Sequence, residues 1–220
     1  MVSAQRPRIG VVRETAPGER RVALVPKVIT QLIGKGLDVI VESGAGEAAL
    51  LPDSAFESAG AVIGNPWDCD VVVKVAEPST DEIAKLSAGT RLIGFLNPRS
   101  QENQIGELKA KGVEAYAMEA IPRISRAQVM DALSSQNNVA GYKAVLVAAA
   151  NLTRFFPMLT TAAGTVKPAT GMVLGLGVSG LQALATARRL GARTIGYDVR
   201  PEVAEQVKSV GAKWLDLGID

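Results

Sequence analysis

The feature of the sequence that most constrains the fold is the glycine-rich stretch Met172–Arg200, MVLGLGVSGLQALATARRLGARTIGYDVR. Gly175, Gly177 and Gly180 form the pattern G-x-G-x-x-G directly after an apolar run that predicts a β-strand. A helical pattern follows, and a second predicted strand ends at Asp198, about twenty residues past the glycines. Strand, glycine turn, helix, strand and acidic residue in this order predict a βαβ unit of the dinucleotide-binding type.

The chemistry of dinucleotides gives each position in this pattern a reason. The first glycine permits the tight turn, the second lets the backbone approach a pyrophosphate, and the third lets helix and strand pack closely. The helix start offers free N–H groups and a partial positive charge to phosphates. Asp198 can accept hydrogen bonds from both ribose hydroxyls and would repel a 2′-phosphate, which favours NAD over NADP. Because of Arg200, NADP remains a possible ligand, although an arginine there can also stack on adenine or stay solvated.

Two other interpretations of this stretch are weaker. A glycine-rich turn in a parallel α/β protein without a ligand would carry the same glycines. Residues 168–187 contain no charge and are long enough to span a bilayer, but glycines crowd their first half, and Ser179 and Gln182 interrupt them. The pattern therefore indicates strand, turn and helix rather than a membrane span.

The part of the chain before this stretch alternates strand-like and helix-like segments. Valine-rich runs such as LDVIVE and DVVVKVAEP alternate with helical patterns of about ten residues. This predicts an α/β protein with a mostly parallel sheet covered on both faces. We expect an N-terminal, flavodoxin-like domain over residues 1–133, a connecting helix over 134–157 and a partial Rossmann nucleotide-binding domain over 158–220.

The composition excludes several classes of function. The net charge is only +2 and aromatic residues are 4% of the chain, which argues against nucleic-acid binding. The chain has no histidine, which excludes Ser-His-Asp and Cys-His catalysis and imidazole metal ligands, so we expect no metal site. The single cysteine, Cys69, cannot form an internal disulfide and favours a reducing, cytoplasmic setting.

A polar connector at 120–136, AIPRISRAQVMDALSSQ, precedes the long helical pattern. Ser125 and Gln128 have the Ser-x-x-Gln spacing of a capping box, and the apolar residues after Gln128 predict one apolar face on a short helix. Arg126 would stand in the first turn of that helix, where the dipole disfavours a cation, and Arg123 would lie just outside the cap. The connector therefore predicts both a capped turn and a contact with an anionic ligand that carries an amide.

Two cationic positions in the N-terminal region leave alternatives open. Lys74 is the only charge inside the run VVVKVA, so it either needs a buried partner or extends to solvent at the strand end. Arg20 and Arg21 follow a Pro-Gly turn and are typical of solvated residues. Alternatively, Arg21 and Lys74 hold a small carboxylate together, or are the remnant of a site that did.

Over its whole length the chain resembles the NAD(H)-binding α subunit of proton-translocating NAD(P) transhydrogenase, in the alanine dehydrogenase and transhydrogenase family. The connector and the loop TAAGTVKP are the most specific segments. The other matching segments are RIGVVRET, GERRVALVP, VESGAG, DVVVKVAEP and GLGVSGLQALATARRLGA. The resemblance implies that hydride passes directly from NADH to NADP⁺ bound on a partner subunit, coupled to proton translocation, with no general acid or base at the carbon.

The resemblance also implies roles for individual residues. Arg123 would lie near the nicotinamide or its phosphate, and Gln128 would reach toward the ribose and the partner nucleotide. Asp131 and Ser134 would hydrogen-bond the carboxamide, which makes Arg123, Gln128 and Asp131 the expected catalytic group. The expected NAD(H) contacts are Arg123, Ile124, Ser125, Gln128, Asp131, Ser134, Gly175, Leu176, Gly177, Val178, Gly180, Asp198, Val199 and Arg200.

Partners and location follow from the same resemblance. It implies a membrane-embedded subunit, an NADP(H)-binding subunit, a homodimer, and a cytoplasmic location peripheral to the inner (cell) membrane through these partners. The family's subunit continues past the position of Asp220, so we expect this chain to be a fragment or truncated product with reduced NAD affinity.

Two alternatives remain beside the transhydrogenase interpretation. An alanine-dehydrogenase-like oxidoreductase shares the positions of Arg21 and Lys74, but it needs a histidine after the strand LIGFL, where this chain has Asn97. Such an enzyme must move a proton as well as a hydride. The second alternative is a non-catalytic, incomplete nucleotide-binding fragment that folds only with a partner.

Overall fold

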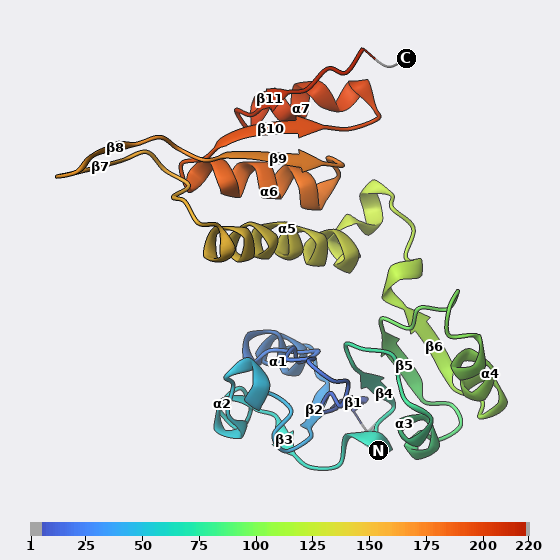
Figure 1. Ribbon diagram of the computed structural model, residues 1–220. Helices are drawn as coiled ribbons and strands as arrows, with labels where there is room; N and C mark the ends of the chain where they lie inside the picture. Colours follow the sequence, from blue (N-terminus) through green and yellow to red (C-terminus); the bar gives the residue numbers. More distant parts are fainter. Residues whose placement is uncertain (1–5, 219–220) are drawn as a thin grey trace. The chain divides into compact units, whose positions relative to one another are not determined.

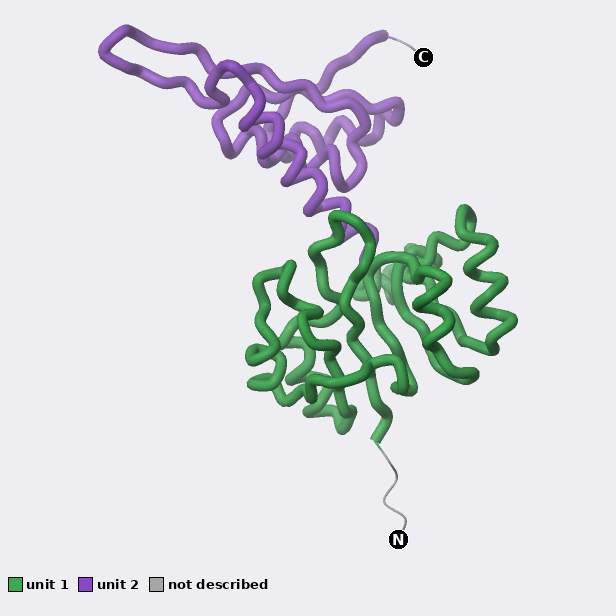
Figure 2. The backbone as a smooth tube through the Cα atoms, turned by 60° about the horizontal axis from the view of Figure 1, so that its bottom comes forward, with its two compact units in different colours: residues 1–131 green, residues 132–220 purple. Residues whose placement is uncertain are grey.

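The structure is a computed structural model that describes residues 6–218 (Figure 1). The chain forms two compact units, residues 1–131 and residues 132–220, which Figure 2 colours separately. Each unit contains a parallel sheet connected by helices and has its own buried core. The α/β fold class expected from the alternating pattern is confirmed.

The N-terminal unit is built on a six-stranded sheet with the order β3-β2-β1-β4-β5-β6, in which all neighbouring strands are parallel. This is the Rossmann strand order, so the flavodoxin-like order expected for this domain, 2-1-3-4-5, is not observed. The order reverses between β1 and β4, and ligands of such sheets bind at the carboxyl ends of the strands at this reversal. The strands are β1 (Arg8–Val11), β2 (Asp38–Val41), β3 (Val62–Ile63), β4 (Val71–Val73), β5 (Arg91–Gly94) and β6 (Glu114–Ala117).

Two hydrophobic clusters fill the N-terminal unit. Adjacent residues of β4 pack into different clusters, Val72 with Leu92 and Val73 against the cluster of Val11 and Phe56. Because strand side chains alternate between faces, each cluster covers one face of the sheet. The helices are α1 (Pro26–Gly34), α2 (Asp53–Ser58), α3 (Thr80–Lys85) and α4 (Glu102–Ala110), with short 3₁₀ turns η1 (Glu47–Ala49) and η2 (Pro66–Asp68).

The second unit contains the glycine-rich stretch as a three-stranded parallel sheet with the order β11-β10-β9. Residues 168–187 lie on β9, the glycine turn and α6, and no helix within residues 6–218 is long and apolar enough to cross a membrane. The elements are β9 (Thr170–Leu174), α6 (Val178–Arg189), β10 (Arg193–Tyr197), η5 (Pro201–Val203), α7 (Ala204–Ser209) and β11 (Lys213–Trp214).

The long helix α5 (Ala132–Asn151) packs against α6 within this unit. Gly141 makes this possible, because a Cβ there would overlap the carbonyl oxygen of Ser179. The helix ends at Asn151, before the end of the expected segment 134–157, and the carbonyls of Phe155 and Phe156 beyond it accept from the N–H of Ala169. The antiparallel hairpin β7 (Leu159–Thr161) and β8 (Gly164–Val166) follows.

We predict that Gly10→Ala in β1 lowers the free energy of unfolding by about 1–3 kcal/mol. A Cβ at Gly10 would overlap the carbonyl oxygen of Pro66. Denaturant titration followed by circular dichroism measures the change. Gly34→Ala in α1 is the matched control, since a Cβ there meets nothing within 4 Å, and it should be neutral or stabilising by up to about 1 kcal/mol. Equal effects of the two substitutions would contradict the close approach at β1.

Candidate functional site

The three glycines of the turn between β9 and α6 differ in backbone conformation and in the space around them. Gly175 has a φ of +84°, a left-handed conformation that favours glycine. A Cβ on Gly180 would overlap the carbonyl oxygen of Gly175, so α6 starts in direct contact with the end of β9. At Gly177, the N-cap residue of α6, a Cβ would meet nothing within 4 Å. Backbone and space at this helix start therefore fit the approach of a pyrophosphate.

Asp198 ties the end of β10 to this turn. Its carboxylate is buried, and Oδ2 accepts a hydrogen bond of 2.6 Å from the N–H of Leu176. Arg200 supplies three further donors: its N–H and Nε donate to Oδ1 at 2.9 and 3.0 Å, and its Nη2 donates to Oδ2 at 3.1 Å. These hydrogen bonds, from the Arg200 side chain first and then from the Leu176 backbone, hold the pKa of Asp198 well below its usual range. The carboxylate is thus ionised and fixed in direction.

The other residues expected to contact the dinucleotide body lie between β9 and α6, at the start of α6, and just after β10. Leu176 is buried, and its side chain belongs to the core of the second unit. Val178, the first residue of α6, and Val199, next to Asp198, are exposed. These two exposed apolar side chains are available for van der Waals contact with an adenosine.

The connector forms a hollow within the N-terminal unit. Its volume is about 240 Å³, and Arg123, Gln128 and Asp131 are among the residues that line it. The 3₁₀ helices η3 (Met118–Ala120) and η4 (Ser125–Met130) bracket the segment that contains Arg123. The full lining is Arg123, Ile124, Ser125, Ala127, Gln128 and Asp131. Five residues expected at the nicotinamide end thus share one hollow, whereas Ser134 lies on α5 in the second unit.

The capping box expected in the connector is wrong. The 3₁₀ helix has Ile124 as its N-cap residue, and no side chain caps it. The apolar face expected after Gln128 is also absent, since Val129 is 94% exposed and the buried residue is Ala127. A 3₁₀ helix has three residues per turn rather than 3.6, so a spacing chosen for an α-helix does not select its inner face. Ser125 and Gln128 are therefore not held by capping, and both line the hollow.

Lys74 lies just past β4. The alternative in which it extends to solvent at the strand end is wrong. Its side chain is 1% exposed, and Nζ lies 3.2 Å from Oε2 of Glu14 and 3.3 Å from Oε2 of Glu82. Nζ also donates to the backbone carbonyl oxygens of Ala76 and Glu77 at 2.9 and 3.3 Å. The buried ammonium is satisfied by two buried carboxylates, as burial of a charge requires.

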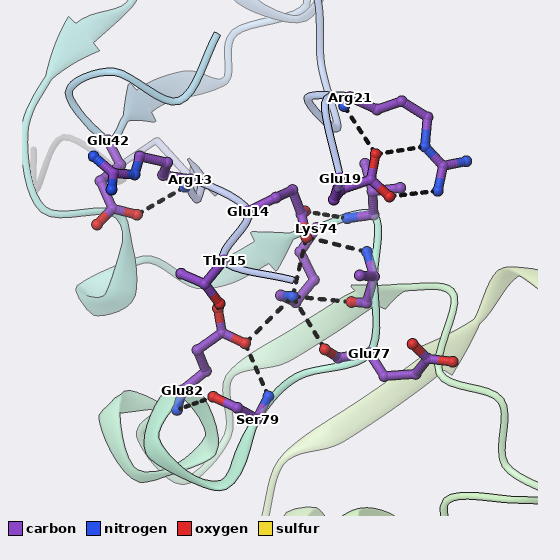
Figure 3. A network of polar contacts seen from close by, with 12 residues as sticks. Arg13, Glu14, Thr15, Glu19, Arg21, Glu42, Lys74, Glu77, Ser79 and Glu82 are labelled. Carbon is purple, nitrogen blue, oxygen red and sulfur yellow. Dashed lines mark hydrogen bonds and ion pairs between the residues drawn. The ribbon is translucent and has the colours of Figure 1, made fainter. Parts of the chain in front are cut away.

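The same carboxylates join three elements at the carboxyl ends of β1 and β4 (Figure 3). Glu14, in the loop after β1, accepts from the backbone N–H groups of Val75 and Ala76. Glu82 accepts from the N–H of Ser79 in a capping box that starts α3. This ion-pair cluster therefore lies at the carboxyl ends of β1 and β4, where the strand order reverses. Lys74 is the only member of this cluster that the sequence pattern singles out.

Arg21 is likewise bonded to a carboxylate of the chain. Its Nη2 lies 2.6 Å from Oε2 of Glu19, and its Nε donates to Oε1 at 2.8 Å. The hydrogen bond from the Arg21 side chain is the main cause that lowers the pKa of Glu19 from 4.5 to about 2. Lys74 and Arg21 are thus both bonded to glutamates of the chain, so a small carboxylate would have to compete with these glutamates for the two cations.

Asn97 stands after β5, where the resemblance to alanine dehydrogenase would require a histidine. Its backbone is left-handed, with φ of +45°, a region that asparagine tolerates. The N–H groups of Leu96 and Asn97 both donate to Oε1 of Glu119. Glu119 therefore fixes this turn, and Asn97 offers an amide side chain but no imidazole.

The comparisons with known proteins place this geometry in a family. The domain described as "Alanine dehydrogenase/PNT, N-terminal domain" matches residues 10–140, and "Alanine dehydrogenase/PNT, C-terminal domain" matches residues 144–218. The chain belongs to the alanine dehydrogenase/PNT family. This is an oxidoreductase family, as the names of the relatives indicate.

Within the alanine dehydrogenase/PNT family the chain is more similar to transhydrogenase subunits than to alanine dehydrogenases. It is 47% identical to an NAD(P) transhydrogenase α-subunit protein of Rhodospirillum rubrum over 96% of this chain and 57% of that protein. It is 46% identical to "NAD(P) transhydrogenase subunit alpha" of Haemophilus influenzae over 95% and 41%. It is 33% identical to the alanine dehydrogenase of Bacillus subtilis over 92% of this chain and 54% of that protein. The chain thus spans about half the length of these relatives.

Solved structures give the same order of similarity. A transhydrogenase from Sinorhizobium meliloti superposes with a TM-score of 0.92 at 45% identity, over 96% of this chain and 62% of that one. An L-alanine dehydrogenase gives 0.84 at 27% identity, over 94% and 60%. The fold of this chain is therefore the α/β fold of the family.

We predict that Lys74→Met destabilises this family member by about 3–5 kcal/mol, because it leaves two carboxylates buried without a cation. Thermal and denaturant unfolding measure the loss. Arg21→Met is the matched control, since its side chain is 47% exposed and its ion pair should contribute no more than about 1 kcal/mol. A smaller loss for Lys74→Met than for Arg21→Met would contradict the buried pairing.

We also predict a pH-dependent contribution from Glu19. Its folded-state pKa of about 2 lies below the ordinary 4.5, so its stabilisation is complete above pH 4.5 and is lost as the pH falls toward 2. The difference in denaturant midpoint between wild type and Glu19→Gln should therefore shrink over this range. In an Arg21→Met background the same substitution should lose most of this pH dependence, and an unchanged profile there would assign the effect to another group.

Proposed function

We propose that this chain is the NAD(H)-binding portion of a transhydrogenase α subunit, which passes hydride from NADH to NADP⁺ bound on a partner subunit. The observation that carries the proposal is the open glycine position beside the ionised carboxylate of Asp198. The identity of 47% to a transhydrogenase subunit over almost the whole chain supports it. The chain spans only a portion of such a subunit, so the activity of the whole assembly is proposed, not that of this chain alone.

The second unit binds the dinucleotide body in this proposal. The first-turn N–H groups of α6 and the open space at Gly177 receive the pyrophosphate. Asp198 accepts from the adenosine ribose, held in direction by the N–H of Leu176. Val178 and Val199 supply apolar contact next to these groups.

The connector handles the nicotinamide end in this proposal. Arg123 pairs with a phosphate or lies against the nicotinamide, and Gln128 reaches to the ribose and the partner nucleotide. Asp131 and Ser134 hold the carboxamide, with Ile124 and Ser125 beside them. When bound, NADH supplies the hydride itself, so the residues bind and orient the ring and exclude water. The absence of histidine from the sequence is compatible with this role, because no proton moves at the carbon.

Partners and location belong to the same proposal. A separate subunit holds NADP(H), and a membrane-embedded subunit couples hydride transfer to proton translocation. The chain acts as a homodimer at the cytoplasmic side of the inner cell membrane, which it reaches through these partners. Relatives that are 46–47% identical are named as α subunits, which supports the presence of further subunits.

An alanine dehydrogenase activity is the second candidate, favoured by relatives that are 33–35% identical. It would need a group that exchanges a proton with the substrate nitrogen or oxygen. The chain has no histidine, and Lys74 and Arg21 are both bonded to glutamates of the chain. These observations favour the transhydrogenase role.

Titration of the chain with NADH, followed by nucleotide fluorescence, tests the dinucleotide site. We predict that Asp198→Asn weakens NADH binding about tenfold, the loss expected for hydrogen bonds to a charged acceptor, and reduces discrimination against NADPH. Glu205→Gln on α7 is the matched control, since Glu205 is an exposed carboxylate of the same unit. Unchanged NADH binding by Asp198→Asn, or no saturable binding by the wild type, would contradict the proposal.

The hydride-transfer role is tested on a version extended to the length of its relatives, mixed with the partner subunits, NADH and an NADP⁺ analogue. Gln128→Asn should slow transfer about tenfold or more while NADH affinity changes less than about threefold, because the contact proposed between Gln128 and the partner nucleotide aligns the two nucleotides for transfer and adds little to NADH binding. Equal losses in rate and affinity would argue against that role. NAD reduction driven by alanine alone would instead support the dehydrogenase candidate.

A further inference from the structure

The carboxylate of Asp198 has all of its acceptor positions occupied by groups of the chain. A carboxylate offers about four lone-pair directions, two on each oxygen. Oδ1 accepts from the backbone N–H and Nε of Arg200, and Oδ2 accepts from the N–H of Leu176 and Nη2 of Arg200. Each oxygen therefore receives one backbone donor and one guanidinium donor.

The two kinds of donor have different consequences. The two backbone donors are the N–H groups of Leu176, in the glycine turn, and of Arg200, after β10. They orient the carboxylate independently of the position of the Arg200 side chain. The guanidinium donors, Nε and Nη2, take the one remaining position on each oxygen. The ribose of a dinucleotide also presents two neighbouring donors, its 2′- and 3′-hydroxyls, and each would need one of those same two positions. Arg200 and a ribose diol therefore cannot both bond to Asp198.

We propose that Arg200 is an internal competitor for the ribose site: its guanidinium must leave Asp198 before a dinucleotide binds, and Arg200 thereby sets both nucleotide affinity and discrimination at the 2′-position. This inference rests on the NAD(H) site proposed above. It assigns Arg200 a role different from a direct NAD(H) contact, which is what the sequence resemblance implies for it.

The structure makes this exchange feasible. The side chain of Arg200 is 54% exposed, whereas that of Asp198 is 6% exposed. The guanidinium can thus rotate into water while the backbone N–H of Arg200 keeps its bond to Oδ1. An ion pair with one partner half in water contributes little net free energy, so its release opposes binding only weakly. Arg200 also directly precedes η5, whose Pro201 restricts the backbone but not this side chain.

Arg200 should act oppositely on the two dinucleotides. Toward NADH it competes with the ribose diol. Toward NADPH it can move with the ligand, because a released guanidinium can pair with the 2′-phosphate in a bidentate manner. That pairing offsets repulsion between the phosphate and Asp198. Removing the guanidinium should therefore strengthen NADH binding and weaken NADPH binding.

The test uses Arg200→Met, which keeps the aliphatic stem and removes all donors, with Arg193→Met at the opposite end of β10 as matched control. Equilibrium titrations give the Kd of NADH and NADPH for each 220-residue chain. We expect the NADH Kd of Arg200→Met to fall about threefold to fivefold and the NADPH Kd to rise, with neither changed in Arg193→Met. A rise in the NADH Kd, or no change, would overturn the competition.

A second measurement separates competition for the diol from simple crowding. Titrations with ADP and with its 2′,3′-dideoxy analogue should show that the gain in Arg200→Met is confined to ADP. An equal gain for both ligands would overturn the inference, since the dideoxy ligand has no diol. The gain should also vanish in Asp198→Asn/Arg200→Met, and its persistence would count against it. A wild-type chain that binds none of these nucleotides would contradict both the inference and the proposed NAD(H) site, whereas binding with the wrong response to Arg200→Met contradicts the inference alone.

Discussion

The N-terminal unit depends on one buried ammonium group. Lys74 lies at the carboxyl end of β4, where a lone cation would be very costly, and two carboxylates from sequence-distant segments meet it there. Because Glu14 comes from the loop after β1 and Glu82 from α3, the cation determines how that loop and that helix meet the sheet. Hydrophobic clusters cover the sheet faces, whereas this polar cluster lies at the carboxyl ends of the strands. The ion pairs thereby fix the geometry at the strand ends, which non-directional hydrophobic contacts alone would not do.

The second unit uses an ion pair in a different way. Asp198 is about as deeply placed as the carboxylates around Lys74, but its cation comes from only two residues away and is half in water. The buried cluster of the first unit is permanent, since each member is enclosed. The Asp198 pair is accessible from one side, so a ligand can replace its cation. Two ion pairs at strand ends thus differ in role because the cation of one is enclosed and the cation of the other is half exposed.

The sequence predicts the features of this structure that depend on local pattern. The glycine spacing correctly indicates β9, the turn and α6, because each glycine has its own backbone or packing reason. The alternation of apolar runs and helical patterns likewise predicts a parallel α/β fold. Strand order is beyond reach of the pattern, because periodicity along the chain carries no information on which strands become neighbours.

The errors concern contacts between distant residues or an unexpected helix type. The partners of Lys74 stand up to 60 residues away in sequence, so local pattern does not decide whether it is buried. An α-helical spacing gives the wrong inner face for the connector, because η4 is a 3₁₀ helix that buries Ala127 and exposes Val129. Arg200 and Asp198 are only two residues apart, but an arginine has several possible partners, and pattern alone does not choose among them.

The glycine turn also determines where folding and binding can be separated. Gly175 and Gly180 serve the backbone itself, one through its left-handed conformation and the other through its contact with the strand end. A family member that abandoned nucleotides would still have to keep both, so their presence is weak evidence of a cofactor. The fold does not require glycine at position 177, because a Cβ there would meet no atom within 4 Å. A small residue retained at that position among relatives would be the better record of selection for a ligand.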